Sequence, residues 1–143
     1  MSSIISVYAL LLLEQKGNVL LLRRSGTRFG SGSFSLPGGK VENVETCRQA
    51  LIREAREELN IELAYQELAF VAVIHKPRLQ DPFMAVCFHA SSWHGQLHNN
   101  EPDKHDLMQW YSLKELPPTL LERHARIIEL YLAGSHYDEF VTT

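Results

Sequence analysis

The chain has 143 residues, of which 45% are hydrophobic and 22% charged, a composition typical of a globular protein with a buried core. Its length predicts a single domain over residues 1–143. The formal net charge of -3 argues against general nucleic-acid binding, which needs a basic face, although local cations or a metal would still admit an anionic small molecule.

Two apolar runs, residues 4–13 and 19–24, flank a Gly-Asn turn and predict a β-hairpin. The first run is too short to span a bilayer, and it has neither a preceding basic residue nor a following small-residue cleavage site. Cys47 and Cys87 follow no C-x-x-C pattern, so we expect reduced packing residues. These features predict a cytoplasmic protein that does not contact the membrane.

A glycine-rich loop over residues 25–40 precedes a predicted helix. Thr46 and Gln49, three residues apart, form a capping-box pattern that places the start of the helix at Thr46. Asn60 follows the last expected helical residue, Leu59, and Asn is second only to Gly in tolerating the left-handed conformation that ends helices.

Strands are predicted over residues 68–75, 83–90 and 107–113, with a proline-containing turn at 76–82 and a polar loop at 95–106 between them. A proline-led amphipathic helix follows, with an apolar stripe of Leu121, Ala125, Ile128 and Leu132. This order of elements predicts the α/β class, with a mixed β-sheet sandwiched between helices.

Three glutamates crowd one face of the first predicted helix. At the helical repeat, Glu54, Glu57 and Glu58 share an arc of about 100°. Leu51, Ala55 and Leu59 form the stripe expected to dock on the sheet, and Arg53 stands in position to pair with Glu57. Helix geometry leaves two interpretations open, because such an acidic face is either simply solvated or binds a hard divalent cation such as Mg²⁺.

The residues before the helix favour the second interpretation. Gly39 is followed after five residues by Glu45, and after seven more by "REAREELNI" from Arg53 to Ile61. This pattern resembles the Nudix box, Gly-x5-Glu-x7-Arg-Glu-U-x-Glu-Glu-x-Gly-U, of the Nudix hydrolase superfamily. "LPGG" before it and "QWYSLKELP" after it are also similar to that family. Two positions depart from the pattern: Ala55 is small but still apolar, and Asn60 replaces the last glycine.

The resemblance implies a Nudix fold and hydrolysis of a phosphoanhydride bond in a nucleoside diphosphate derivative, with Mg²⁺ or alternatively Mn²⁺ as the cofactor. Carried onto this chain, the expected metal ligands are Glu54, Glu57, Glu58 and the carbonyl of Gly38. Glu54 is alternatively the group that positions or deprotonates the attacking water. Glu45 and Arg53 are expected to complete the catalytic group, with Arg53 orienting a carboxylate rather than touching substrate.

Candidate substrate contacts are more widely spread. Arg23, Arg28 and Lys40 are either phosphate contacts or surface charges, with Arg23 favoured because it should end a strand near the loop. Gly39 would let the backbone approach the ion and substrate closely. Phe34 is either a base-stacking side chain or a core anchor, and either Trp110 or Tyr111 would line a base pocket. Glu101 is preferred over Asp103 and Asp106 as a further carboxylate, and the seven histidines show no ligand spacing.

Several functional alternatives remain at this point. The substrate is a nucleoside triphosphate, including oxidised ones, or else ADP-ribose or a nucleotide sugar, to which Pro77 gives weak support. A non-catalytic nucleotide-binding Nudix module would usually lose box glutamates, and these are intact. A prenyl-diphosphate isomerase of the same fold would need a cysteine in an early loop, whereas Cys47 lies in the helix. The expected partner is a nucleotide-like small molecule bound by a monomer or homodimer, with no nucleic acid.

Overall fold

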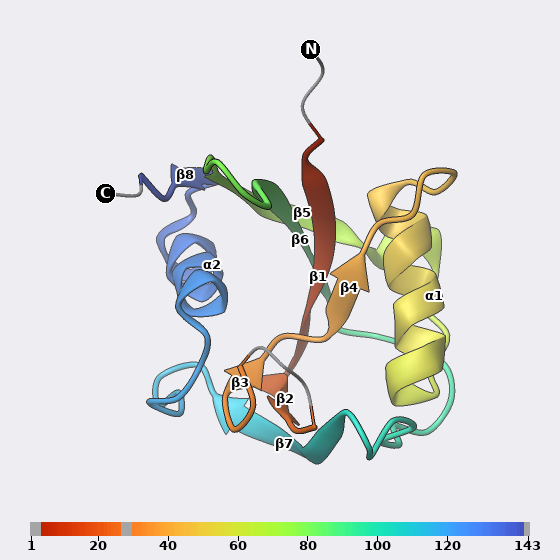
Figure 1. Cartoon of the computed structure of the whole chain (residues 1–143). Coiled ribbons are helices and arrows are strands. Elements are labelled where there is room, and N and C mark those ends of the chain that lie inside the picture. Colours follow the sequence, from red (N-terminus) through yellow and green to blue (C-terminus); the bar gives the residue numbers. More distant parts are fainter. Residues whose placement is uncertain (1–3, 27–29, 142–143) are drawn as a thin grey trace.

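A computed structural model describes residues 4–26 and 30–141, which form a twisted mixed sheet between two helices (Figure 1). In chain order the elements are β1 (Ser6–Gln15), β2 (Asn18–Arg24), β3 (Phe34–Ser35), β4 (Gly38–Lys40), α1 (Cys47–Leu59), the 3-10 helix η1 (Tyr65–Glu67), β5 (Ala69–Lys76), β6 (Phe83–Ala90), β7 (His105–Ser112), α2 (Glu122–Ala133) and β8 (Tyr137–Glu139). The predicted α/β class and mixed sheet are confirmed.

Strand β1 is the centre of the sheet. It pairs in parallel with β6 along its length, and antiparallel with β4 near its start and with β2 at its end. The strand order is β3-β2-β1-β6-β5-β8, with β4 added to β1 and β7 added to β2. The short β4 therefore lies directly beside Tyr8, Ala9 and Leu10 of the central strand.

The apolar residues of β1 serve two cores. Leu11 and Leu13 belong to the cluster covered by α1, whereas Leu10 and Leu12 belong to the cluster covered by α2. Successive side chains of a strand point to opposite faces, so a strand buried on both faces reads as one continuous apolar run. This explains the apolar run over residues 4–13, and no helix in the described part of the chain is long and apolar enough to cross a membrane.

The turn of the first hairpin lies one residue earlier than expected. Gln15 pairs with Asn18, which leaves Lys16 and Gly17 as a two-residue turn. Both have positive φ, 53° and 78°, as a turn of this length requires when it follows the right-handed twist of its strands. Asn18 is therefore the first residue of β2 rather than part of the turn.

Both predicted ends of α1 are confirmed. Thr46 caps the helix, its side chain accepting from the Gln49 amide while the Gln49 side chain accepts from the Thr46 amide. Asn60 ends it in the left-handed conformation at φ 62°. The predicted docking stripe of Leu51, Ala55 and Leu59 is buried against the sheet.

Other elements differ from the prediction. The expected loop at residues 25–40 contains β3 and β4, and β8 was not foreseen. The buried face of α2 consists of His124, Ile127 and Ile128, while Leu132 is 59% exposed, so the predicted stripe is wrong at its C-terminal end. The helix packs mainly against β5. Cys87 is buried, Cys47 is half-buried, and neither forms a disulfide.

Candidate active site

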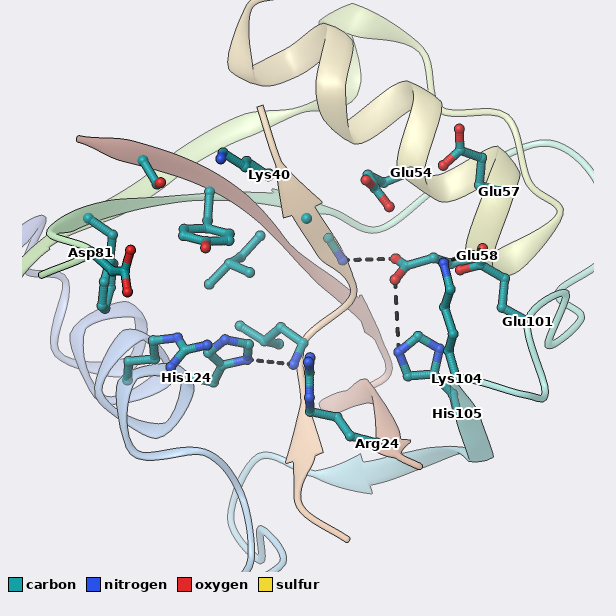
Figure 2. Close-up of a pocket in the computed structure, with 18 of the residues that line it drawn as sticks. Arg24, Lys40, Glu54, Glu57, Glu58, Asp81, Glu101, Lys104, His105 and His124 are labelled. Carbon is teal, nitrogen blue, oxygen red and sulfur yellow. Dashed lines mark hydrogen bonds and ion pairs between the residues drawn. The ribbon is translucent and has the colours of Figure 1, made fainter. Parts of the chain in front are cut away.

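A cleft of about 610 Å³ opens between α1 and the start of α2, across β1 and β4. Figure 2 shows Glu54, Glu57, Glu58 and Glu101 gathered on the α1 side of this cleft, with His124 and Asp81 on the opposite side. The three helix glutamates are graded in exposure: Glu58 is buried, Glu54 is half-buried, and the Glu57 side chain is 49% exposed. The carboxylates predicted from the helix repeat therefore do face a common cavity.

The glycine pair brings β4 against these carboxylates. The Gly38 amide donates to Glu58 Oε1 at 2.9 Å. Gly38 has φ of 139°, and a Cβ there would lie 2.1 Å from the Ala9 carbonyl oxygen. A Cβ on Gly39 would lie 2.5 Å from Glu54 Oε1. Only glycine fits at Gly38, because φ is positive there and the backbone of β1 lies directly beside it. A side chain at Gly39 would instead displace the Glu54 carboxylate.

Arg53 links the carboxylates of the Nudix-like box. Its guanidinium forms a two-point contact with Glu45, at 2.7 and 3.1 Å, and donates to Glu54 at 2.9 Å and to Glu57 at 3.3 Å. A further bond reaches the Lys40 carbonyl. The expected pairing of Arg53 with a carboxylate is thus present, and Arg53 and Glu45 themselves stand behind the cleft rather than along it.

Burial and crowding raise the proton affinity of two of the glutamates. Burial, with the nearby charge of Glu54, holds the pKa of Glu58 well above its usual range despite the Gly38 hydrogen bond. Burial also raises the pKa of Glu54, and the Arg53 guanidinium opposes that shift. The hydrogen bond from Arg53 lowers the pKa of Glu45. The negative charges of Glu54 and Glu58 are therefore only partly balanced by nearby positive groups, whereas the charge of Glu45 is balanced by Arg53.

Cationic side chains line the cleft as well. Among the described residues the lining contains five cations, namely Arg24, Lys40, Arg78, Lys104 and Arg123, and five carboxylates, namely Glu54, Glu57, Glu58, Glu101 and Asp81. Such a mixed lining suits an elongated anion whose charge is shared between the cations and a metal ion held by carboxylates. Carboxylates alone would repel that anion.

Three of the predicted substrate contacts line the cleft, and the other described ones do not. Gly39, Lys40 and Glu101 are lining residues. Arg23 is instead bonded to Asp106 at 2.7 Å on the surface, and its neighbour Arg24 lines the cleft. The pairing of β2 with β7 shifts register between these two arginines, and such a bulge changes which side chain points inward. Arg28 lies outside the described residues.

The aromatic candidates lie in the cores. Phe34 is only 6% exposed and packs edge-on against Tyr111, with ring centroids 5.2 Å apart. Trp110 stacks on Trp93 in the cluster beneath α1. Neither lines the cleft, so the core-anchor alternative for Phe34 describes its position. His89 contacts Glu14 and Tyr131 instead of the cleft, and His75 does not line it.

Several lining residues were not singled out by the sequence. His124 lies in the first turn of α2 and accepts a hydrogen bond at Nδ1 from the Leu36 amide, 2.8 Å away, which fixes the loop before the glycine pair. His105 begins β7 beside Glu58. Arg78 and Asp81 come from the β5–β6 turn, and Arg123 comes from α2. These residues are far apart in the sequence and only the fold brings them together, so no sequence motif could have identified them.

The carboxylates fit a hard divalent cation. Glu54, Glu57, Glu58 and Glu101 offer oxygen donors, and the close approach of β4, which any Cβ would prevent, brings backbone beside them. Glu58, Glu101 and His105 each offer one ligand atom, and these three atoms lie within 4.8 Å of one another. A divalent ion requires such oxygen donors, and its charge would balance the buried carboxylate of Glu58.

Comparisons with known proteins agree with this geometry. Residues 3–131 match the sequence model of the NUDIX domain. An NAD-capped RNA hydrolase NudC from Pseudomonas aeruginosa is 34% identical over 127 residues, which are 87% of this chain but only 44% of NudC. The CTP pyrophosphohydrolase of Escherichia coli strain K12 is 33% identical, with 85% of this chain and 87% of that enzyme aligned. The crystal structure of a MutT NUDIX hydrolase from Burkholderia pseudomallei superposes with a TM-score of 0.82 at 27% identity, covering 90% of this chain and 98% of that chain.

Proposed function

The chain belongs to the Nudix hydrolase superfamily, and we propose that it hydrolyses a nucleoside triphosphate to the nucleoside monophosphate and pyrophosphate with Mg²⁺ or Mn²⁺ as cofactor. The observation that carries this proposal is the cleft in which α1 carboxylates face cationic side chains from β2, β4, the β5–β6 turn and α2. A triphosphate is an elongated anion that would contact both walls. The length-matched CTP pyrophosphohydrolase relative makes CTP the first nucleotide to test.

A bound divalent ion would neutralise the polyphosphate and lower the pKa of its water, and Glu54, Glu57, Glu58 and the Gly38 carbonyl are the proposed ligands. Arg53 holds Glu54 and Glu57 in place through its bonds to both. Glu54, next to Gly39, is alternatively the group that accepts a proton from the attacking water instead of binding the ion. Arg24, Lys40 and Arg123 would bind phosphate oxygens and the leaving pyrophosphate.

A second candidate substrate is the NAD cap of an RNA, because several relatives are NAD-capped RNA hydrolases. The chain spans less than half the length of those relatives, so their matched part is the shared domain alone. An NAD cap contains the same pyrophosphate linkage, flanked by two nucleosides. The same cleft could therefore bind an NAD cap, and assays with NAD-capped RNA test the expectation that the chain has no nucleic-acid substrate.

The test is a substrate panel with purified protein and either Mg²⁺ or Mn²⁺. It contains CTP, the other nucleoside triphosphates, oxidised triphosphates, ADP-ribose, nucleotide sugars, NAD and NAD-capped RNA. We expect monophosphate and pyrophosphate from at least one triphosphate, and a loss of about 100-fold or more in kcat for Glu57→Gln. Glu129→Gln, which removes an exposed carboxylate on α2 outside the cleft, is the matched control and should retain wild-type rates.

The competing interpretation is a Nudix module that binds nucleotides without turning them over. It predicts saturable binding of a nucleotide, measured by calorimetry, with no product from any substrate in the panel. That result would contradict the proposed activity. Turnover of NAD-capped RNA but of no triphosphate would support enzymatic activity and show that the proposed substrate class is wrong.

A further inference from the structure

We propose that His105 supplies an imidazole nitrogen ligand to the divalent ion of the proposed site, at the end of the cleft where Glu58 and Glu101 lie beside it. The inference rests on the proposed metal-dependent function and deepens it, because it concerns which ion the site selects. Glutamates of the box account for oxygen ligands only. A histidine in the same site changes the chemistry of the donor set.

The three side chains converge from separate parts of the chain. Glu58 comes from the last turn of α1, Glu101 from the loop after β6, and His105 from the first residue of β7. One potential ligand atom from each lies within 4.8 Å of the other two. His105 Nε2 is 4.0 Å from Glu58 Oε2, too long for a good hydrogen bond but compatible with an ion between the two groups (Figure 2).

His105 lacks the hydrogen bonds that a buried imidazole normally makes. The residue is 7% exposed, and its Nδ1 is a buried side-chain atom without a hydrogen-bond partner among the described residues. Buried polar atoms of this kind are uncommon because each unsatisfied one costs free energy.

The backbone around these residues is built to hold them together. The Glu101 carbonyl accepts from the amides of both Lys104 and His105, each at 2.9 Å, which closes a tight turn. Asn99 Nδ2 donates to the His105 carbonyl at 2.7 Å. The turn therefore sets Glu101 and His105 side by side regardless of what their side chains bind.

The same loop is tied to the end of α1 that carries Glu58. The His98 amide donates to the Leu59 carbonyl, and the Asn100 amide donates to the Glu58 carbonyl, each at 3.0 Å. The last carbonyls of a helix have no partner within the helix, and here the loop supplies donors to them. The three candidate ligands thus sit on one connected framework, as a preorganised metal site requires.

Ligand chemistry decides which ion this site would prefer. Mg²⁺ favours oxygen donors and retains much of its water, whereas imidazole binds transition ions more tightly along the series from Mn²⁺ upward. Replacing an oxygen or water ligand by His105 would therefore favour Mn²⁺ over Mg²⁺. A packing role for His105 predicts the opposite pattern, with fold stability affected but no ion preference.

The test is Mn²⁺ binding followed by electron spin resonance on the full chain. Spin-echo modulation from a directly bound ¹⁴N should appear in the wild type and change to the ¹⁵N pattern when the protein carries ¹⁵N-histidine. His105→Phe keeps a ring in the buried position and removes both nitrogens. His98→Gln, in the same loop with an exposed side chain, is the matched control.

We expect His105→Phe to lose the nitrogen modulation and to bind Mn²⁺ about 10-fold or more weakly, with Mg²⁺ affinity nearly unchanged. His105→Gln, checked for folding by circular dichroism, should do the same, and His98→Gln should match the wild type. Mn²⁺ bound without nitrogen modulation in an active wild type would overturn the inference while the proposed function stands. Hydrolysis that needs no metal, with no Mn²⁺ bound, would overturn both.

Discussion

Arg53 is the residue on which the geometry of the carboxylates most depends. It bonds to Glu45, Glu54 and Glu57 together, and the Glu45 contact raises its own pKa, so it stays charged. Glu54 and Glu58 form a like-charged pair four residues apart, which by itself weakens a helix by about 0.2–0.5 kcal/mol. Arg53 offsets part of this repulsion, and its planar fork suits the two-point contact with Glu45.

Arg53→Lys tests this positioning role. Lysine keeps the charge but cannot bond to Glu45 at two points and reach Glu54 as well, so the carboxylates should lose their fixed orientation. We expect kcat to fall about 10-fold or more, while the free energy of unfolding changes by about 1 kcal/mol or less. Arg56→Lys, on the exposed side of the same helix, should leave kcat unchanged. Equal kcat in the wild type and Arg53→Lys would contradict the role.

His124 predicts a pH dependence of stability. Burial holds its pKa well below 6.5, and Nδ1 accepts from the Leu36 amide, so the native state needs a neutral ring. The unfolded chain takes up a proton near pH 6.5 and the native state does not, so the free energy of unfolding should fall as the pH drops below that value. One such group gives a slope of at most about 1.4 kcal/mol per pH unit.

Denaturant titrations between neutral and mildly acidic pH measure this effect. His124→Asn keeps an acceptor near the Leu36 amide without a titrating ring, so its stability should fall less steeply with acid than that of the wild type. His105, whose pKa burial also lowers, contributes equally to both proteins and cancels in the difference. Parallel curves for the two proteins would show that His124 is protonated as readily in the native state as in the unfolded one.

At the level of elements, α1 is defined by its caps. The sequence departs from the Nudix pattern at Asn60, yet the residue adopts the left-handed conformation that the missing glycine would have. The Asn60 amide donates to the Arg56 carbonyl and the Ile61 amide to the Ala55 carbonyl, and these two bonds close the helix. The departure therefore leaves the end of α1, and with it Glu57 and Glu58, in the expected place.

Substitutions at Asn60 should follow backbone strain rather than side-chain chemistry. Asn60→Gly restores the family residue and should change the free energy of unfolding by only a few tenths of a kcal/mol. Asn60→Ala should cost about 1 kcal/mol or more, because alanine tolerates positive φ poorly. Both should retain kcat, since neither removes a lining residue. A large loss of kcat in Asn60→Gly would show that the Asn side chain itself acts in the site.

Gly38 makes a stronger prediction for β4. Alanine there combines positive φ with a Cβ 2.1 Å from the Ala9 carbonyl, so β4 must move away from β1 and the glutamates. Gly17→Ala is the matched control, because its φ is also positive but no atom lies within 4 Å of the new Cβ. We expect about 1–2 kcal/mol of destabilisation for Gly17→Ala and clearly more for Gly38→Ala, with activity lost only in the latter. Chemical denaturation and turnover assays measure both.

The sequence correctly predicted those elements that are determined by residues close together in the chain. The capping box, the docking stripe and the end of α1 at Asn60 could be read from neighbouring residues, and so could strand Phe83–Ala90. The missed features depend on distant partners. Strand β8 exists because it pairs with β5, and Arg24 replaces Arg23 in the cleft because β7 shifts register beside them. His105 reaches Glu58 only through the loop that α1 anchors.

For the whole molecule, the sheet and its two helices hold the two walls of the cleft at a fixed separation. The α1 wall carries the carboxylates and the α2 wall carries Arg123 and His124, each backed by its own apolar cluster. Close packing makes these clusters resist deformation, so the distance between the two walls should stay the same when no ligand is bound. The burial of Glu58 is then a cost to stability that the ion would remove.

Metal binding should therefore stabilise the whole fold. An ion at 100 times its Kd adds about 2.7 kcal/mol to the free energy of unfolding, so Tm should rise with Mn²⁺ concentration. Glu58→Gln should lose this rise, and without metal it should be at least as stable as the wild type, because it no longer buries a carboxylate. A wild-type Tm that does not respond to Mn²⁺ or Mg²⁺ would contradict metal binding at this site.

The central claim is hydrolysis of a triphosphate at the anhydride bond that releases pyrophosphate. The most direct measurement is ³¹P NMR of CTP and the other triphosphates after incubation with the protein and Mg²⁺ or Mn²⁺, with paramagnetic Mn²⁺ removed on a chelating resin before the spectra are recorded. We predict that a monophosphate and a pyrophosphate signal grow in equal amounts, and that neither appears with Glu57→Gln. Release of orthophosphate and a nucleoside diphosphate, or intact triphosphates beside a folded, metal-bound protein, would contradict the account.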